Sequence, residues 1–154
     1  HEVLERVRQL VQVESTGGLI IENDYDPSIP DIYADKDQLI QAILNIARNA
    51  LQAMEGKGRI IFKTRIYRHM NVGHKHYKLA VKCDIIDNGP GIDPNMMSQI
   101  FYPMITGRAE GTGLGLSIAQ ALITQNNGMI ECNSEAGNTV FSVLLPMGTD
   151  NDYV

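Results

Sequence analysis

The glycine-rich stretch from Asp87 to Leu116 limits what this chain can fold into more than any other part of it. It holds six of the chain's fourteen glycines within thirty positions. Glycine loses more backbone freedom on folding than other residues, so this density indicates that the backbone must approach something closely, most simply a ligand. The apolar run Leu79–Ile86 leads into Asp87 and then Asn-Gly-Pro-Gly. This pattern predicts a strand that ends with one carboxylate at the rim of a turn.

The second half of the stretch predicts the start of a helix. Gly111-Thr-Gly-Leu-Gly precedes apolar residues at helical spacing. The N–H groups that open a helix have no partner within it and suit phosphate. No Gly-Lys-Ser/Thr of a P-loop occurs, and no Gly-x-Gly-x-x-Gly of a dinucleotide site can be aligned from Gly111 or Gly113. We therefore predict a third kind of nucleotide site.

A long helix is predicted from about residue 36 to 54, with Asp35 as N-cap and Gln38 at the capping-box position. One side is apolar, and the other is a row of carboxamides with one arginine. Asn45 and Asn49 lie one turn apart and can present two amide oxygens, which suit a hard cation. A polar side that simply meets solvent or another loop is an equally good interpretation. The row consists of Gln38, Gln41, Asn45, Arg48, Asn49 and Gln52.

Two antiparallel strands are predicted over Arg59–Arg65 and Tyr77–Asp87, joined by a polar, basic loop from Arg68 to His76. The loop contains three histidines, which raises the possibility of a metal site. No carboxylate or cysteine accompanies them, so a solvent-exposed hairpin tip is the better interpretation.

The remaining elements complete a fold. We expect a leading helix over 2–13, a short strand at Leu19–Ile21, a helix over 114–126 and a closing hairpin. The hairpin joins Met129–Cys132 to Thr139–Leu145, and an acidic, flexible tail follows over 147–154. This order predicts a two-layer α/β sandwich, with a mixed, mostly antiparallel sheet of about five strands and about three helices on one face.

Length and charge exclude several classes of protein. The 154 residues suit one domain, and no stretch approaches the length of an apolar membrane span. The net charge of −5 argues against nucleic acid as the main partner. Cys83 and Cys132 lack CxxC spacing and are expected to be reduced core thiols of a cytoplasmic protein. The chain does not begin with Met and opens in a helical pattern, so we expect it to be a piece of a longer protein.

Taken together, these motifs resemble the ATP-binding catalytic domain of bacterial histidine kinases, in the GHKL (HATPase) superfamily with its Bergerat fold. The resemblance rests on four boxes in order: Asn-x-x-x-Asn-Ala, Asp-x-Gly-x-Gly, a Phe-containing linker and Gly-x-Gly-x-Gly at a helix start. It extends to the leading helix, to DYDPSIPDIYAD and to the closing hairpin, and so covers nearly the whole chain. Within the family, ARNALQA, FYPMITGR and GTGLGLSIAQ most resemble the NtrB type of nitrogen-regulation sensor kinase.

The resemblance implies ATP and Mg²⁺ as ligands and gives individual residues roles. Asp87 would accept a hydrogen bond from the adenine amine, Gly89 and Gly91 would leave room for the base, and Asn49 would ligate Mg²⁺ with Asn45 nearby. Residues 101–110 would form a flexible lid over ATP, with Phe101 as its hinge. The other positions implied to line the nucleotide site are Ile92, Thr106, Gly111, Thr112, Gly113, Leu114, Gly115 and Leu116.

Two departures from related patterns carry information. Gyrase-type ATPases have a Glu that activates water where this chain has Asn45, which implies slow hydrolysis and favours a kinase. Many histidine kinases have Lys or Arg three residues after the second Asn, where this chain has Gln52. We expect the charge of the phosphates to be met by Arg108 or Arg48, although Arg108 as a merely solvated charge is nearly as good an interpretation.

The resemblance also implies partners. No His followed by Glu or Asp and then Pro is present, so the phosphoacceptor is expected on a dimerisation domain outside this chain, to which residues 1–13 would lead. We expect a monomer here, a homodimeric parent, a response regulator of the NtrC type and binding of the PII signal protein. No nucleic acid or membrane partner is expected. A GHKL-fold ATPase and a catalytically silent docking module are the alternatives.

Overall fold

One five-stranded sheet organises the protein. The computed structural model describes residues 1–154 except 16, 73, 102–114 and 148–154. The strands lie in the order β1-β2-β3-β5-β4, with β1 parallel to β2 and the other neighbouring pairs antiparallel. They are β1 (Leu19–Asp24), β2 (Gly58–Val72), β3 (Lys75–Asp87), β4 (Met129–Glu135) and β5 (Asn138–Pro146).

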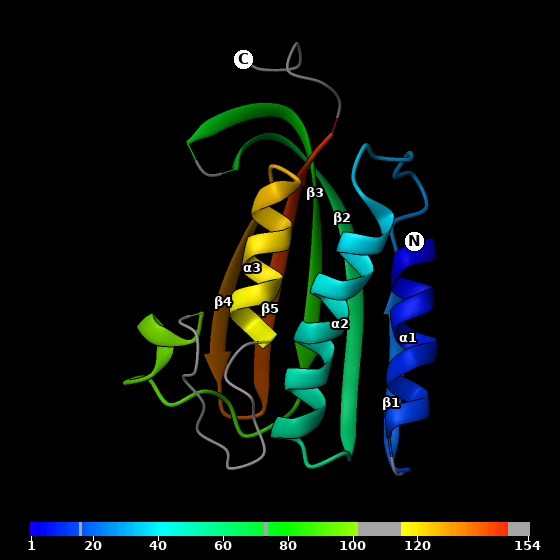
Figure 1. Ribbon diagram of the computed structural model, residues 1–154, viewed down its shortest axis with the longest axis vertical. Coiled ribbons are helices and arrows are strands. Elements are labelled where there is room, and N and C mark those ends of the chain that lie inside the picture. The colour runs from blue at the N-terminus through cyan, green and yellow to red at the C-terminus, as the bar shows by residue number, and fades with distance from the viewer. Residues whose placement is uncertain (16, 73, 102–114, 148–154) are drawn as a thin grey trace.

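Three α-helices cover one face of this sheet (Figure 1). They are α1 (Glu2–Glu14), α2 (Lys36–Ala53) and α3 (Gly115–Gln125), and a short 3₁₀ turn at Met97–Gln99 lies between β3 and α3. The predicted two-layer α/β sandwich with a mixed sheet is therefore confirmed.

The core lies between the helices and the inner face of the sheet. Phe62, Ile85 and Phe141 are essentially buried on the strands, where alternate residues point to one face. Val7 and Val11 of α1 are fully buried in the same cluster. The leading helix is therefore an integral part of this domain's core.

None of the described helices is long and apolar enough to cross a membrane.

The start of α2 follows the predicted cap only in part. Asp35 Oδ1 accepts a hydrogen bond from the Gln38 backbone N–H at 3.0 Å, as an N-cap should. The Gln38 side chain does not close a capping box with Asp35. It bonds instead to Gln125, the last residue of α3, and to Asn126, which follows it, and Asn126 Oδ1 accepts the Asp35 N–H at 2.8 Å. The start of α2 is thereby tied to the end of α3.

The β2–β3 hairpin corrects the prediction of a loop from Arg68 to His76. The strands continue to Val72 and from Lys75, so most of that segment is strand. Val72 and Tyr77 are 5% and 4% exposed, in a second apolar cluster that includes Leu144. In Figure 1 this end of the hairpin curves toward the β4 side of the sheet. The apolar residues among the basic ones hold it there.

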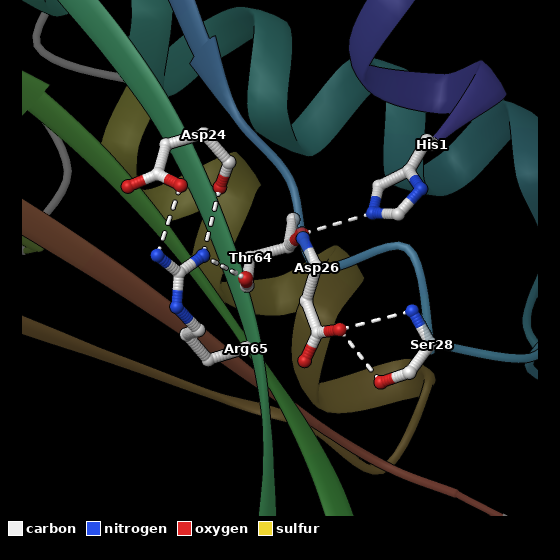
Figure 2. A network of polar contacts seen from close by, with 6 residues as sticks. All are labelled: His1, Asp24, Asp26, Ser28, Thr64 and Arg65. Atoms are coloured by element: carbon white, nitrogen blue, oxygen red, sulfur yellow. Dashed lines mark hydrogen bonds and ion pairs between the residues drawn. The ribbon is translucent and has the colours of Figure 1, made fainter.

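A polar network anchors the turn-rich segment after β1 to the sheet (Figure 2). The hydroxyl of Thr64, a buried residue of β2, accepts the Asp26 backbone N–H at 3.0 Å and lies 2.9 Å from the His1 ring nitrogen. Arg65, the next residue, forms an ion pair with Asp24 at 2.9 Å. This segment stays outside the sheet, as its prolines predict, but is not free of it.

Candidate nucleotide-binding site

Asp87 is the last residue of β3. It lies on the inner face of the sheet and is 4% exposed. Its Oδ1 accepts a hydrogen bond from the backbone N–H of Gly89 at 2.9 Å. A buried carboxylate is costly unless hydrogen bonds satisfy it. The local turn thus fixes the carboxylate that the sequence placed at its rim.

Gly89 and Gly91 allow the turn to pack closely. A Cβ on Gly89 would lie 3.0 Å from Asp87 Oδ1 and 3.1 Å from the Met54 side chain at the end of α2. Gly91 has φ +90°, and a Cβ there would lie 2.9 Å from the Glu135 carbonyl oxygen. Gly91 therefore needs glycine for reasons internal to the protein, and a side chain at Gly89 would have to displace the side chains of Asp87 and Met54. The contact of both glycines with a base stays a prediction.

The β4–β5 hairpin supports this turn from one side. Ser134 Oγ accepts the Ile92 backbone N–H at 2.8 Å, and Gly89 O accepts the Gly137 N–H at 2.9 Å. Ser134 Oγ also lies 2.7 Å from the Thr139 hydroxyl. Ser134 and Thr139 were not among the predicted site residues. The available signal was two hydroxyl residues at inner-face positions of strands that are otherwise apolar on that face.

Asn45 on α2 is 9% exposed and has both ends of its amide engaged. Its oxygen accepts from Gln41 Nε2 at 2.8 Å, and its nitrogen donates to the Gly115 carbonyl at 3.2 Å, where α3 begins. Asn49, one turn later, is half-buried, and its side chain has no hydrogen-bond partner among the described residues. Of the two amides, Asn49 is therefore the one that can turn its oxygen to a cation.

Arg48 is engaged elsewhere in the helical layer. Its Nε lies 3.0 Å from each carboxylate oxygen of Glu14, the last residue of α1. Hydrogen bonding to Glu14 raises the pKa of the Arg48 guanidinium. This side chain joins α1 to α2. Arg108, the other residue proposed to meet phosphate charge, lies outside the described residues.

The other predicted site residues fall into two groups. Thr106, Gly111, Thr112, Gly113 and Leu114 lie outside the described residues. Ile92, Phe101 and Leu116 are partly buried and pack against the main core. The Phe101 ring meets Phe141 of β5 edge to face, with ring centroids 6.2 Å apart. The predicted hinge is thus seated on the sheet.

Helix α2 brings the two halves of the site together. Its Met54 end lies against the glycine turn, and its middle, at Asn45, holds the start of α3. Beside the turn, burial and then the Asp87 carboxylate raise the pKa of the Cys132 thiol to about 12. The site therefore combines a buried acid, a row of amides and the N-terminus of a helix, which suits the base, the cation and the phosphates of a nucleotide.

A cavity of about 470 Å³ lies elsewhere and is not this site. On β3 it is lined by Val81 and Cys83, whereas Asp87 ends that strand. Neither Asp87 nor Asn49 lines it. The candidate site at the glycine turn is therefore separate from this cavity.

Comparison with known proteins agrees with this geometry. Residues 34–149 match the family model described as histidine kinase-, DNA gyrase B-, and HSP90-like ATPase. The chain is 50% identical over 149 residues to the sensory histidine kinase/phosphatase NtrB of Vibrio alginolyticus, covering 96% of this chain and 43% of that protein. The resemblance to histidine kinases of the NtrB type is confirmed. The chain spans less than half the length of the curated relatives it matches.

Solved structures give the same result for the fold. The catalytic domain of histidine kinase ThkA, in a nucleotide-free form, matches with a TM-score of 0.76 at 26% identity, covering 95% of this chain and 91% of that one. Full-length ShkA in complex with AMPPNP matches with a TM-score of 0.72 at 27% identity, covering 93% of this chain and 29% of that one.

Proposed function

Since this chain belongs to the family of histidine kinase-, DNA gyrase B- and HSP90-like ATPases, we propose that it binds ATP with Mg²⁺ at the site between α2 and the glycine turn. The observation that carries the proposal is the buried Asp87 carboxylate, held by the Gly89 N–H at 2.9 Å at the end of β3. A carboxylate accepts hydrogen bonds and can recognise the exocyclic amine of adenine, which guanine does not present in that position. ShkA, a relative in fold, binds AMPPNP.

The remaining contacts follow from the chemistry of the donors. Asn49 would offer its amide oxygen to Mg²⁺, which binds few protein ligands and keeps several waters. Asn45, already bonded to Gly115 and Gln41, would hold the start of α3 in place for the phosphates. Backbone N–H groups from Gly111 to Leu116 and the guanidinium of Arg108 would meet the phosphate oxygens.

The activity of the whole protein is part of the same proposal. ATP supplies the γ-phosphate, which would pass to a His on a dimerisation domain outside this chain and then to an Asp of an NtrC-type response regulator. The Asn45 amide does not accept a proton at neutral pH, so it cannot activate water as a carboxylate would. This favours transfer over hydrolysis and argues against the alternative of a GHKL-fold ATPase.

The proposal extends to location and regulation. We infer that the chain acts in the cytoplasm, and that the longer protein to which it belongs is a homodimer that receives the PII signal protein. Two surfaces are offered for PII: the lid at 101–110 and the hairpin at 66–78. Because the hairpin is folded, its basic side chains should be tested by charge reversal, for example Lys75→Glu with Lys78→Glu, and not by deletion. Unchanged PII affinity in that variant would exclude the hairpin.

The first test is displacement of a fluorescent ATP analogue from the chain by ATP, ADP and GTP, with and without Mg²⁺. We expect adenine nucleotides to compete, GTP to compete poorly and Mg²⁺ to strengthen binding. Asp87→Asn should weaken ATP binding while the circular dichroism spectrum stays unchanged. Absence of binding at millimolar nucleotide would favour the docking module, and sustained multiple turnover would favour the ATPase.

A further inference from the structure

We propose that Ser134 is a positioning residue for adenine recognition. Through its hydroxyl it would fix the far end of the glycine turn, whose near end is fixed by Asp87. It would thereby set how the Asp87 carboxylate faces the base. This inference rests on the proposed binding of ATP and deepens it.

Three hydrogen bonds hold the glycine turn. Its near end donates the Gly89 N–H to Asp87 Oδ1 at 2.9 Å, and its far end donates the Ile92 N–H to Ser134 Oγ at 2.8 Å. Between these ends, Gly89 O accepts the Gly137 N–H at 2.9 Å. Two of these three bonds therefore come from the β4–β5 hairpin. The position of the turn depends on that hairpin as much as on β3.

A neighbouring hydroxyl, that of Thr139, orients the Ser134 hydroxyl. Ser134 faces Thr139 across the β4–β5 pair, and their hydroxyl oxygens are 2.7 Å apart. Thr139 is 3% exposed and faces Asp87 across the β3–β5 pair. The three polar residues thus form one row across three strands on the inner face. Because Thr139 occupies one side of the Ser134 hydroxyl, a lone pair is directed at the Ile92 N–H.

The glycine turn has little room between itself and β4. At Gly91 a Cβ would lie 2.9 Å from Glu135 O and 3.2 Å from Ser134 Oγ. The turn therefore lies directly on β4, with no room for a side chain at Gly91 between the turn and Ser134 Oγ. Without the hydroxyl, the Ile92 N–H would lack its partner and the turn would be released on this side. The Gly89 N–H, and with it the orientation of the Asp87 carboxylate, would then shift.

A role in positioning makes a specific prediction. The contact that reads the base passes through Asp87, whereas phosphate binding passes through α2 and the start of α3. Loss of Ser134 Oγ should therefore weaken binding of ATP more than binding of inosine triphosphate, which lacks the exocyclic amine. A purely structural role would lower the unfolding temperature and weaken both nucleotides alike.

The experiment measures dissociation constants for ATP and inosine triphosphate, by competition with a fluorescent ATP analogue, together with the unfolding temperature. Ser134→Ala is expected to weaken ATP binding about tenfold, because a backbone amide loses its partner. Inosine triphosphate should change much less, so that selectivity falls. Ser134→Thr, which keeps the hydroxyl, should restore it.

A matched control is Ser142→Ala. Ser142 is also a strand serine, 3% exposed, but its hydroxyl bonds to Asp84 at 2.6 Å on the opposite face of the sheet. Its loss should leave selectivity unchanged.

Each outcome is decisive. Two results would show that Ser134→Ala keeps the wild-type selectivity: both affinities unchanged, or an equal loss for both nucleotides. Either result would overturn the positioning role and leave the proposed binding of ATP intact. A wild-type chain that does not prefer ATP to inosine triphosphate would overturn the adenine assignment, and the role of Ser134 with it.

Discussion

The side-chain amide of Asn45 on α2 donates a hydrogen bond to the backbone carbonyl of Gly115, the first residue of α3, at 3.2 Å. Because the acceptor is a carbonyl, the amide must present its nitrogen there and its oxygen to Gln41, which donates to it at 2.8 Å. Asn45, at the position where the resemblance implies a catalytic Glu in gyrase-type ATPases, thus joins two helices. The Asn45 amide therefore holds the start of α3 against α2.

Asn45→Ala should therefore destabilise the fold. The change leaves a Gly115 carbonyl in a largely buried contact without its donor, which costs about 1–3 kcal/mol. Gln41→Ala, at an exposed position, removes only the bond to the Asn45 oxygen and should cost less, about 0.5–1 kcal/mol. Urea unfolding of both variants measures the difference. Equal losses would mean that the bond to Gly115 contributes nothing.

Asn49→Ala should act on the metal and not on the fold. The Asn49 side chain has no hydrogen-bond partner among the described residues, so its removal should change unfolding by less than about 0.5 kcal/mol. The gain in affinity for the ATP analogue on adding Mg²⁺ should be lost. Binding without Mg²⁺ serves as the internal control. A full Mg²⁺ effect in this variant would remove Asn49 from the metal site.

The ion pair of Arg48 with Glu14 gives a test of what meets the phosphate charge. Both side chains are partly exposed, at 42% and 36%, so a double-mutant cycle should give a coupling of only about 0.5–1 kcal/mol. If Arg48 serves only this ion pair, then the ATP affinity of Arg48→Ala and of Glu14→Ala should equal that of the wild type. Weaker ATP binding in Arg48→Ala alone would give Arg48 the phosphate role and release Arg108 from it.

Stability at high pH should depend on Cys83. Burial raises the pKa of this thiol from 9.0 to about 12. A group whose pKa is raised on folding stabilises the protein below its unfolded pKa, and this contribution is lost as the pH rises toward the folded value. The free energy of unfolding should therefore fall above pH 9, by about 1.4 kcal/mol per pH unit for this thiol. Urea midpoints at pH 8, 9 and 10 check the slope, which Cys83→Ala should reduce.

Much of this arrangement could be predicted because its signals are local. The apolar period of α2, the Asp35 cap and the strand that ends at Asp87 each lie within one segment, and each is confirmed. Ser134 escaped prediction because its two partners, Ile92 and Thr139, lie on different segments and meet only in the sheet. A serine in a strand carries no sign of such contacts.

The distal β2–β3 hairpin escaped for another reason. Its basic residues and histidines outweigh the apolar residues between them, so the segment has the composition of a loop. The strand pairing continues nevertheless, because Met70, Val72 and Tyr77 of the two strands pack in one cluster with the start of β4 and the last part of β5. The composition of this segment predicts exposure to solvent, whereas the apolar residues at alternate positions of its strand are the ones that the structure buries.

A substitution in this second cluster tests that correction. Tyr77 is 4% exposed and in contact with the cluster around Leu144, and truncation of a buried aromatic costs about 3–5 kcal/mol. Tyr77→Ala should therefore lower the free energy of unfolding by an amount in or somewhat below that range. His74→Ala, at the exposed turn of the same hairpin, is the matched control and should change it by less than about 0.5 kcal/mol.

Nucleotide affinity should hardly change in Tyr77→Ala, because Tyr77 and Asp87 lie at opposite ends of β3. A free hairpin tip makes the opposite prediction for stability, since a residue that packs on nothing can be removed without loss. Urea unfolding with tyrosine fluorescence or circular dichroism distinguishes the two. Equal stability of the Tyr77→Ala and His74→Ala variants would mean that the hairpin is not held by this cluster in solution.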